Sequence, residues 1–187
     1  MKKALVIFAE GSEEIEVVVP IDVLRRANVE VTVAGLGSCE PLKCSRNVLI
    51  KPDCKLDSLD VQNSNYDIII IPGGLKGAES ISKNDLVASF LKNQHESKRY
   101  LAFICAAPIA LLENRLAIGS KITSYPAFKD KLSKDYQYSD ERVVVDQEAR
   151  LITSQGPCTS FEFAFEIVNI LIGRDESQKV KSAMLFK

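Results

Sequence analysis

Four consecutive isoleucines, Ile68 to Ile71, constrain the fold more than any other part of the sequence. Successive side chains of a β-strand point to opposite faces, so a strand made only of isoleucine is apolar on both faces. Such a strand needs cover on both sides, which a parallel sheet between two layers of helices provides. The segment YDIIIIPGG, residues 66–74, therefore predicts a central buried strand.

Apolar runs of strand length alternate with segments of helical period along the rest of the chain. We expect further strands at 5–8, 30–36, 44–52 (as a hairpin or edge strand) and from Leu101, then short ones within 121–126, 141–146 and 150–157. We expect helices at about 13–26, 85–96, 160–173 and 175–186. This order predicts one domain, residues 1–187, of the α/β class with a mostly parallel sheet.

Composition narrows the range of partners and locations. The net charge is −1, from 24 basic and 25 acidic residues, so nothing favours a nucleic-acid or membrane-surface partner. The first apolar run, ALVIFA, meets a charge at Glu10, and no run approaches the roughly 20 residues of a membrane span. We expect a cytoplasmic protein, with nuclear or mitochondrial locations open if the source is eukaryotic.

The cysteine and histidine content argues against disulfides and metal. Five cysteines are widely spaced without a CxxC pair, which is typical of reduced thiols rather than a disulfide framework. The one histidine, His95, lies in the polar segment KNQHESKR, so we expect no zinc site. We also expect no cofactor.

Cys105 is the strongest candidate for a reactive group. It follows the apolar run that begins at Leu101 and precedes a helical pattern, so the sequence predicts a strand-to-helix turn there. The N–H groups and positive end of a following helix would favour a thiolate. The alternative is a buried cysteine that acts as a small hydrophobic residue.

Glu16 is the candidate acid. On a helix from about Glu13 it shares a stripe with Val19, Pro20 and Val23, which predicts a buried carboxyl with a raised pKa. A protonated carboxyl could donate a hydrogen bond to a thiolate or a sulfinate. A carboxylate that only complements the N-terminus of its helix is an equally good reading.

A pair of glycines, Gly73 and Gly74, follows the isoleucine strand. Glycine permits positive φ and lets backbone N–H groups approach a ligand, so Gly74 and Ala106 could donate to an oxyanion. A tight turn is the simpler explanation of Pro-Gly-Gly. No imidazole neighbours Cys105 in the sequence, which disfavours a cysteine peptidase.

These segments together resemble the ThiJ/PfpI superfamily over essentially the whole chain. The matching segments are KALVIFAEGSEEIE, DVLRRANVEVTVAGL, KCSRNV, YDIIIIPGG, ICAAP, TSYPAFKDKL and TSQGPCTSFEFAFEIV. Protease members of the superfamily carry a histidine directly after the cysteine, whereas this chain has Ala106. The resemblance therefore favours the deglycase branch.

The resemblance implies a flavodoxin-like three-layer sandwich and a homodimer. It implies Cys105 as the reactive cysteine, Glu16 as its hydrogen-bonding acid, and Gly74 and Ala106 as oxyanion donors. It also places Arg46 near the pocket at the dimer interface, with Arg26 beside it. Members oxidise this cysteine to a sulfinate and have been assigned glyoxalase, deglycase and chaperone roles.

Two positions depart from the superfamily pattern among the expected pocket residues Gly73, Tyr125, Pro157 and Cys158. Tyr125 stands where some members have histidine, and a phenol with a pKa of about 10 is a poor base at neutral pH, so turnover is expected to be slow. Cys158 stands where glycine is usual and could place a second thiol near the pocket.

Two functions follow from the same residues. In the first, Cys105 attacks an α-oxoaldehyde such as methylglyoxal, or its early adduct with a protein thiol or amine, and Glu16 relays protons to give a hydroxy acid such as lactate. In the second, Cys105 is a non-enzymatic sensor or a chaperone switch whose sulfinate alters stability or partner binding.

Overall fold

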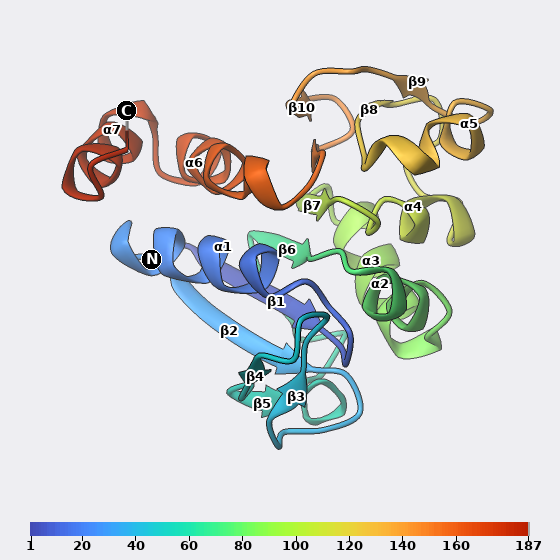
Figure 1. Cartoon of the computed structure of the whole chain (residues 1–187), viewed down its shortest axis with the longest axis horizontal. Helices are drawn as coiled ribbons and strands as arrows, with labels where there is room; N and C mark the ends of the chain where they lie inside the picture. The colour runs from blue at the N-terminus through green and yellow to red at the C-terminus, as the bar shows by residue number, and fades with distance from the viewer. Residues whose placement is uncertain (187) are drawn as a thin grey trace.

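A seven-stranded sheet lies at the centre of the molecule in the computed structural model, which describes residues 1–186 (Figure 1). Two small sheets, β3 with β4 and β8 with β9, lie outside this sheet. The strands of all three sheets are β1 (Lys3–Phe8), β2 (Glu30–Gly35), β3 (Leu42–Lys43), β4 (Leu49–Ile50), β5 (Cys54–Lys55), β6 (Ile68–Ile71), β7 (Tyr100–Ile104), β8 (Lys121–Ile122), β9 (Gln137–Tyr138), β10 (Val143–Asp146) and β11 (Leu151–Ser154). The α-helices are α1 (Glu14–Arg26), α2 (Leu75–Ser82), α3 (Asp85–Glu96), α4 (Ile109–Glu113), α5 (Lys129–Leu132), α6 (Ser160–Leu171) and α7 (Arg174–Ala183).

The sheet is mostly parallel, as the sequence predicts. Its strand order is β10-β11-β7-β6-β1-β2-β5, and every neighbouring pair is parallel except β10 with β11. From β1 the chain adds β2 and β5 on one side and then returns to place β6 and β7 on the other. The crevice outside the ends of β1 and β6 is therefore a topological switch point, where open α/β sheets bind ligands.

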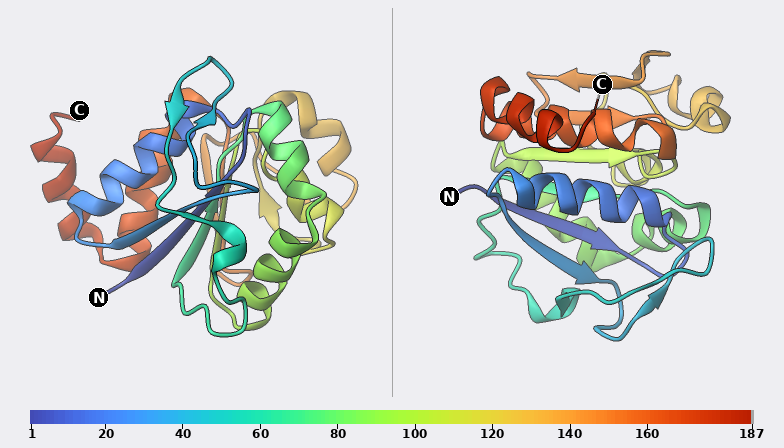
Figure 2. Two further views of the ribbon diagram at one scale, coloured as in Figure 1. Left: turned by 90° about the horizontal axis from the view of Figure 1, so that it is seen from below. Right: turned by 60° about the vertical axis from the view of Figure 1, so that its left-hand side comes forward.

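Helices cover both faces of the sheet. One core joins Ala4, Val6 and Phe8 of β1 to α1, α6 and α7, while the other joins Leu5 and Ile7 to α2, α3 and α4. Figure 2 shows these two sets of helices on opposite sides of the strands. The isoleucines of β6 divide in the same way, because Ile68 and Ile70 belong to the first core and Ile69 and Ile71 to the second. All four are fully buried, which confirms the three-layer prediction.

Two of the predicted strands are much shorter than expected. The strand expected at 44–52 is only β4, which pairs antiparallel with β3, and residues 45 and 46 turn back because they bind Glu14 of α1. The strand expected at 121–126 is only β8, since the chain enters a 3-10 helix at Pro126–Phe128. Within the described residues, no helix is both long enough and apolar enough to cross a membrane.

Candidate active site at the carboxyl edge of the sheet

Cys105 follows the last residue of β7 and occupies the predicted turn before α4. Its φ is +65°, a left-handed conformation that is unusual for a residue with a Cβ. The backbone on both sides fixes this conformation, because the Cys105 N–H donates to the carbonyl of Ser154 at 2.9 Å and its own carbonyl accepts from Tyr125 N–H at 2.8 Å. The thiol is partly exposed, as a nucleophile requires.

Glu16 lies on the first turn of α1 and is fully buried. Glu13 accepts a hydrogen bond from the Glu16 N–H at 2.9 Å, so Glu13 caps the helix and the Glu16 side chain is free for another role. Glu16 Oε2 accepts the N–H of Gly73 at 2.7 Å. Its other oxygen, Oε1, is buried and has no hydrogen-bond partner in the described part of the chain.

The carboxyl of Glu16 and the side chain of Cys105 lie on either side of the same point at Gly73, close enough for each to shift the pKa of the other. Burial raises the pKa of Glu16 to about 7, which agrees with the expected weak acid. Burial and the nearby Glu16 carboxylate together raise the pKa of the Cys105 thiol to about 12. Because one negative charge opposes the other, the pair loses only one proton near neutral pH and carries a single charge.

The N–H groups that face the sulfur are those of the expected oxyanion donors and not those of the helix after Cys105. The helix after Cys105, α4, has five residues and begins only at Ile109, so its N-terminus is not the source. Instead the N–H groups of Gly74 and Ala106 reach the sulfur and partly offset the rise in the thiol pKa. Gly74 is the N-cap of α2 and has a φ of +84°. A thiolate is thus stabilised by these donors only while Glu16 holds the remaining proton.

Gly73 allows the thiol and the carboxyl to meet. An added Cβ would lie 2.6 Å from both Cys105 Cβ and Glu16 Oε2, so even alanine has no room. Gly73 is needed for this close approach and not for a positive φ, which only its neighbour Gly74 adopts. The predicted meeting of the loop before α1, the double glycine and the Cys105 turn is confirmed by these contacts.

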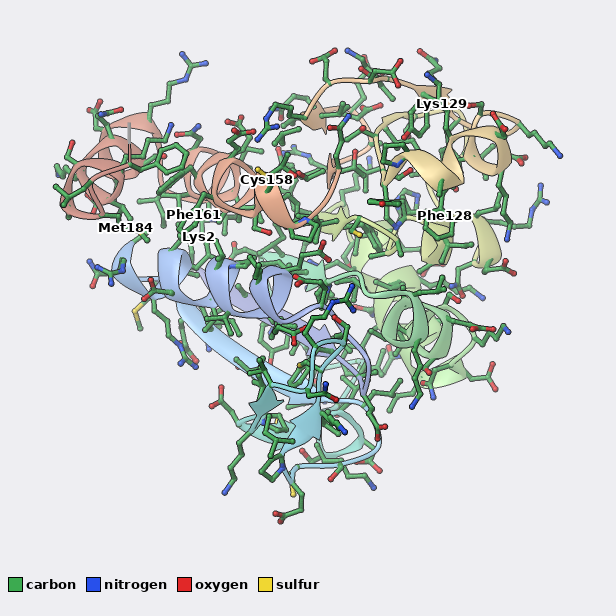
Figure 3. All side chains as sticks on the ribbon, viewed as in Figure 1. Lys2, Phe128, Lys129, Cys158, Phe161 and Met184 are labelled. Atoms are coloured by element: carbon green, nitrogen blue, oxygen red, sulfur yellow. The ribbon has the colours of Figure 1, made fainter. Side chains whose placement is uncertain are left out.

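The other expected pocket residues, Tyr125, Pro157 and Cys158, lie on segments that neighbour the Cys105 turn. Tyr125 is held beside Cys105 by its backbone, and its side chain is 48% exposed. Pro157 and Cys158 lie in the short 3-10 helix that follows β11. Strand β11 pairs with β7, the strand that precedes Cys105. Cys158 is exposed at the start of α6, and its carbonyl accepts from Arg142 (Figure 3). Cys158 and Cys105 are both free thiols, so no disulfide joins them within residues 1–186.

Arg46 and Arg26 are not beside each other within one chain. The N–H of Arg46 donates to Glu14, the first residue of α1, at 2.7 Å, whereas Arg26 is the last residue of that helix and pairs with Asp22. Their separation spans the whole helix, about 18 Å at 1.5 Å per residue. The expected juxtaposition requires a second copy of the chain.

Two contacts of the site were not predicted from the sequence. Glu14 accepts from Ser45 Oγ at 2.8 Å as well as from Arg46, so it fixes the β3–β4 hairpin beside the site. Ser154 supports the Cys105 backbone and bonds through its side chain to Thr159 at 2.6 Å. The contacts of Glu14 with the hairpin and of Ser154 with Cys105 join residues far apart in the sequence, so no local pattern indicates them.

His95 does not belong to this site. It lies near the end of α3, before β7 begins, whereas Cys105 follows the other end of that strand. The strand of five residues separates them by roughly 16 Å at about 3.3 Å per residue. A cysteine–histidine pair is therefore absent from the described chain.

Comparison with known proteins agrees with this architecture. The profile of the DJ-1/PfpI family matches residues 2–170. The chain is 46% identical to the Parkinson disease protein 7 homolog of Danio rerio, covering all of this chain and 98% of the relative. It is 40% identical to the glutathione-independent glyoxalase DJR-1.2 of Caenorhabditis elegans, covering 96% and 94%. The crystal structure of Drosophila melanogaster DJ-1beta superposes with a TM-score of 0.95 at 43% identity, covering 100% and 98%. The chain therefore belongs to the DJ-1/PfpI family.

Proposed function

We propose that this protein is a cofactor-independent glyoxalase that converts α-oxoaldehydes, including early adducts on thiols or amines, into α-hydroxy acids. The observation that carries the proposal is the contact between a partly exposed Cys105 and a buried Glu16 whose pKa is raised to about 7. A relative with 40% identity is a glutathione-independent glyoxalase, which supports the same activity here.

The first chemical step is addition of the Cys105 thiolate to the aldehyde carbon. The new C–S bond places negative charge on the former carbonyl oxygen, which takes up a proton to give a hemithioacetal. The N–H groups of Gly74 and Ala106 converge on the sulfur and are placed to donate to that oxygen. Glu16 supplies the proton, because it holds one near neutral pH.

The second step moves hydrogen between the two carbons of the substrate. The ionised Glu16 removes the proton from the carbon bound to sulfur, which gives an enediol, and the neighbouring carbon is then protonated. The first carbon is oxidised to a thioester and the second is reduced to an alcohol, so no outside oxidant is needed. Water then releases the α-hydroxy acid and restores the thiol. A pKa near 7 allows Glu16 to act in both directions.

The test is lactate formation from methylglyoxal in the absence of glutathione. Cys105→Ala and Cys105→Ser should each abolish turnover, whereas Cys39→Ala, which changes an exposed thiol elsewhere, should retain it. Turnover that survives in both Cys105 variants would dismiss the mechanism.

We also propose that the protein is a homodimer formed through α1. Ile15 and Val18 are 47% and 48% exposed on this helix, and Val48 and Leu49 are exposed on the hairpin that Glu14 holds against it. A two-fold axis across α1 would set two helices antiparallel. Arg26 of the partner subunit would then lie near Arg46, as the family resemblance implies.

Redox sensing is a second candidate, and the unpartnered Glu16 Oε1 favours it. An oxygen added to the Cys105 sulfur could accept a hydrogen bond from a protonated Glu16, which would stabilise a sulfinate. After graded peroxide, intact mass should show two added oxygens in the native protein and none at this position in Cys105→Ser. The same gain in the variant would exclude Cys105 as the sensor.

A further inference from the structure

A positively charged cavity opens beside the glycine loop of the proposed active site. It has a volume of about 380 Å³, and its lining includes Lys43, Arg46, Lys76 and Leu75. Glu10 is the one acidic residue in the lining, and it pairs with Lys76 at 3.0 Å. With three cations and one anion, the lining residues have a net charge of +2, or +1 when the neighbouring Glu14 carboxylate is included, whereas the whole chain has −1. The local charge therefore differs in sign from that of the molecule.

Two of the cations have no acidic partner of their own. Lys43 and Arg46 are exposed, and neither forms an ion pair within residues 1–186. The one side-chain hydrogen bond of Arg46 goes to the carbonyl of Ser45 at 3.2 Å. Glu14, although close, is occupied by Ser45 Oγ and by the backbone N–H of Arg46. The positive charge is thus available to a ligand.

The cavity is built on fixed backbone. The N–H of Gly11 donates to the carbonyl of Lys43 at 2.8 Å, and the N–H of Ser45 donates to the carbonyl of Ser12 at 2.8 Å. These bonds hold the hairpin against the loop that follows β1. Binding an anion between these elements would need movement of side chains only.

The loop at Gly74 and Leu75 neighbours both the cavity and the reactive sulfur. Leu75 lines the cavity, and the N–H of the preceding residue, Gly74, reaches the sulfur of Cys105. Gly74 also packs on the segment 11–13, at the edge of the cavity. A small molecule with its aldehyde at Cys105 could therefore extend a second group past Leu75 into the cavity.

We propose that Lys43, Lys76 and Arg46 bind the anionic group of the substrate, and that the preferred substrates are α-oxoaldehydes that carry a carboxylate or a phosphate ester. This inference rests on the proposed glyoxalase function and specifies its substrate class. The attraction acts on the bound substrate and on the transition state alike, so it should lower KM more than it changes kcat.

The test compares three substrates with the same reacting group. Methylglyoxal is neutral, 4,5-dioxopentanoate carries a carboxylate, and hydroxypyruvaldehyde phosphate carries a phosphate ester. In Lys43→Gln/Lys76→Gln, kcat/KM for the two anionic substrates should fall by about two- to fivefold for each charge removed, mainly through KM. The loss for methylglyoxal, which carries no charge for these residues to bind, should be smaller than the loss for either anion.

A matched control removes two charges elsewhere. Lys51 and Lys92 are exposed, lie outside the cavity and form no ion pair in the described chain, so Lys51→Gln/Lys92→Gln should leave all three substrates unaffected. A larger fall for only one anionic substrate would identify the acidic group that the cavity prefers. Equal losses for neutral and anionic substrates, or no loss for either anion, would overturn the inference while leaving the glyoxalase function intact.

Alkylation of Cys105 gives a readout that needs no turnover. The ratio of its rate with anionic iodoacetate to its rate with neutral iodoacetamide should fall in Lys43→Gln/Lys76→Gln and stay constant in Lys51→Gln/Lys92→Gln. An unchanged ratio in the cavity variant would contradict the inference even if no α-oxoaldehyde proved to be a substrate.

Discussion

Cys105 adopts a backbone conformation that a side chain with a Cβ normally avoids. A residue at φ +65° costs on the order of 1 kcal/mol, and the hydrogen bonds to Ser154 and Tyr125 hold it there. The result directs the sulfur toward the N–H groups of Gly74 and Ala106. The sequence predicts a turn at this position, but the sign of φ depends on partners from two distant segments.

The backbone of Gly73 packs against both Cys105 and Glu16 and leaves no room for a side chain at this position. Gly73→Ala should destabilise the protein by roughly 2 kcal/mol or more, because the new Cβ overlaps both groups. Denaturant unfolding measures this change. Gly156→Ala is the control, since a Cβ there would meet only Tyr125 at an ordinary 3.6 Å. Equal free energies of unfolding for Gly73→Ala and Gly156→Ala would mean that Cys105 and Glu16 can move apart at little energetic cost.

Glu16 should make the stability of the protein depend on pH. Its folded pKa of about 7 lies above the ordinary value of 4.5, so between these values the unfolded chain loses a proton that the folded protein keeps. The stabilising effect is therefore complete below about pH 4.5 and is lost as pH rises through 7. The free energy of unfolding should fall by on the order of 2 kcal/mol across this window.

Glu16→Gln removes that titration and serves as the comparison. The native protein minus the variant should show the downward slope in urea titrations between pH 4.5 and 7. Parallel stability curves for the two proteins would show that Glu16 titrates normally. The sequence predicts burial of Glu16 from its apolar stripe, whereas the hydrogen bond to Gly73 depends on the fold.

Among the elements, the β3–β4 hairpin departs most from what the sequence predicts. The structures of β6 and α3 follow from their own sequences. The isoleucines make β6 apolar on both faces, and Asn84 caps the start of α3. The hairpin is decided instead by Glu14 on α1, whose carboxylate binds Ser45 and Arg46. A local pattern contains no information about that distant partner.

Glu14→Ala should loosen this hairpin without unfolding the sheet. Burial alone raises the pKa of Glu14, but hydrogen bonds from its own backbone, Ser45 and Arg46 outweigh it and lower that pKa, which indicates strong binding of the carboxylate. Loss of these charge-assisted bonds should speed hydrogen exchange at the Arg46 amide by about tenfold or more.

Glu40→Ala provides the control for this measurement. Glu40 lies in the loop just before the hairpin, and its carboxylate makes no hydrogen bond in the described chain. Exchange at Arg46 that is equally fast in both variants would show that Glu14 does not hold the hairpin.

At the scale of the whole molecule, the proposed dimer explains the exposed apolar residues of α1. Val18→Asp places a charge on that face and should convert the dimer into a monomer, because burying an unpaired carboxylate is costly. Sedimentation equilibrium measures the mass. Ile118→Asp, at a comparably exposed position (44%) that is far from α1 in the sequence, should leave the mass unchanged.

A Val18→Asp protein that stays dimeric would place the interface elsewhere. The sequence predicts the layers of the molecule well, since β6 and the amphipathic helices each define which surfaces are buried. It does not predict the interface from periodicity, because an exposed valine on one helix has the same local pattern as a buried one.

The central claim is that Cys105 and Glu16 share one negative charge, and a pH titration of the thiolate absorbance tests it most directly. The account predicts a thiolate signal in two steps in the native protein, a partial one as the pair loses its first proton near pH 7 and the rest only at much higher pH, when the second proton leaves. In Glu16→Gln a single step should replace the two, because the amide neither titrates nor carries a charge that opposes the thiolate. Identical curves for the two proteins, or a native signal with no step near pH 7, would contradict it.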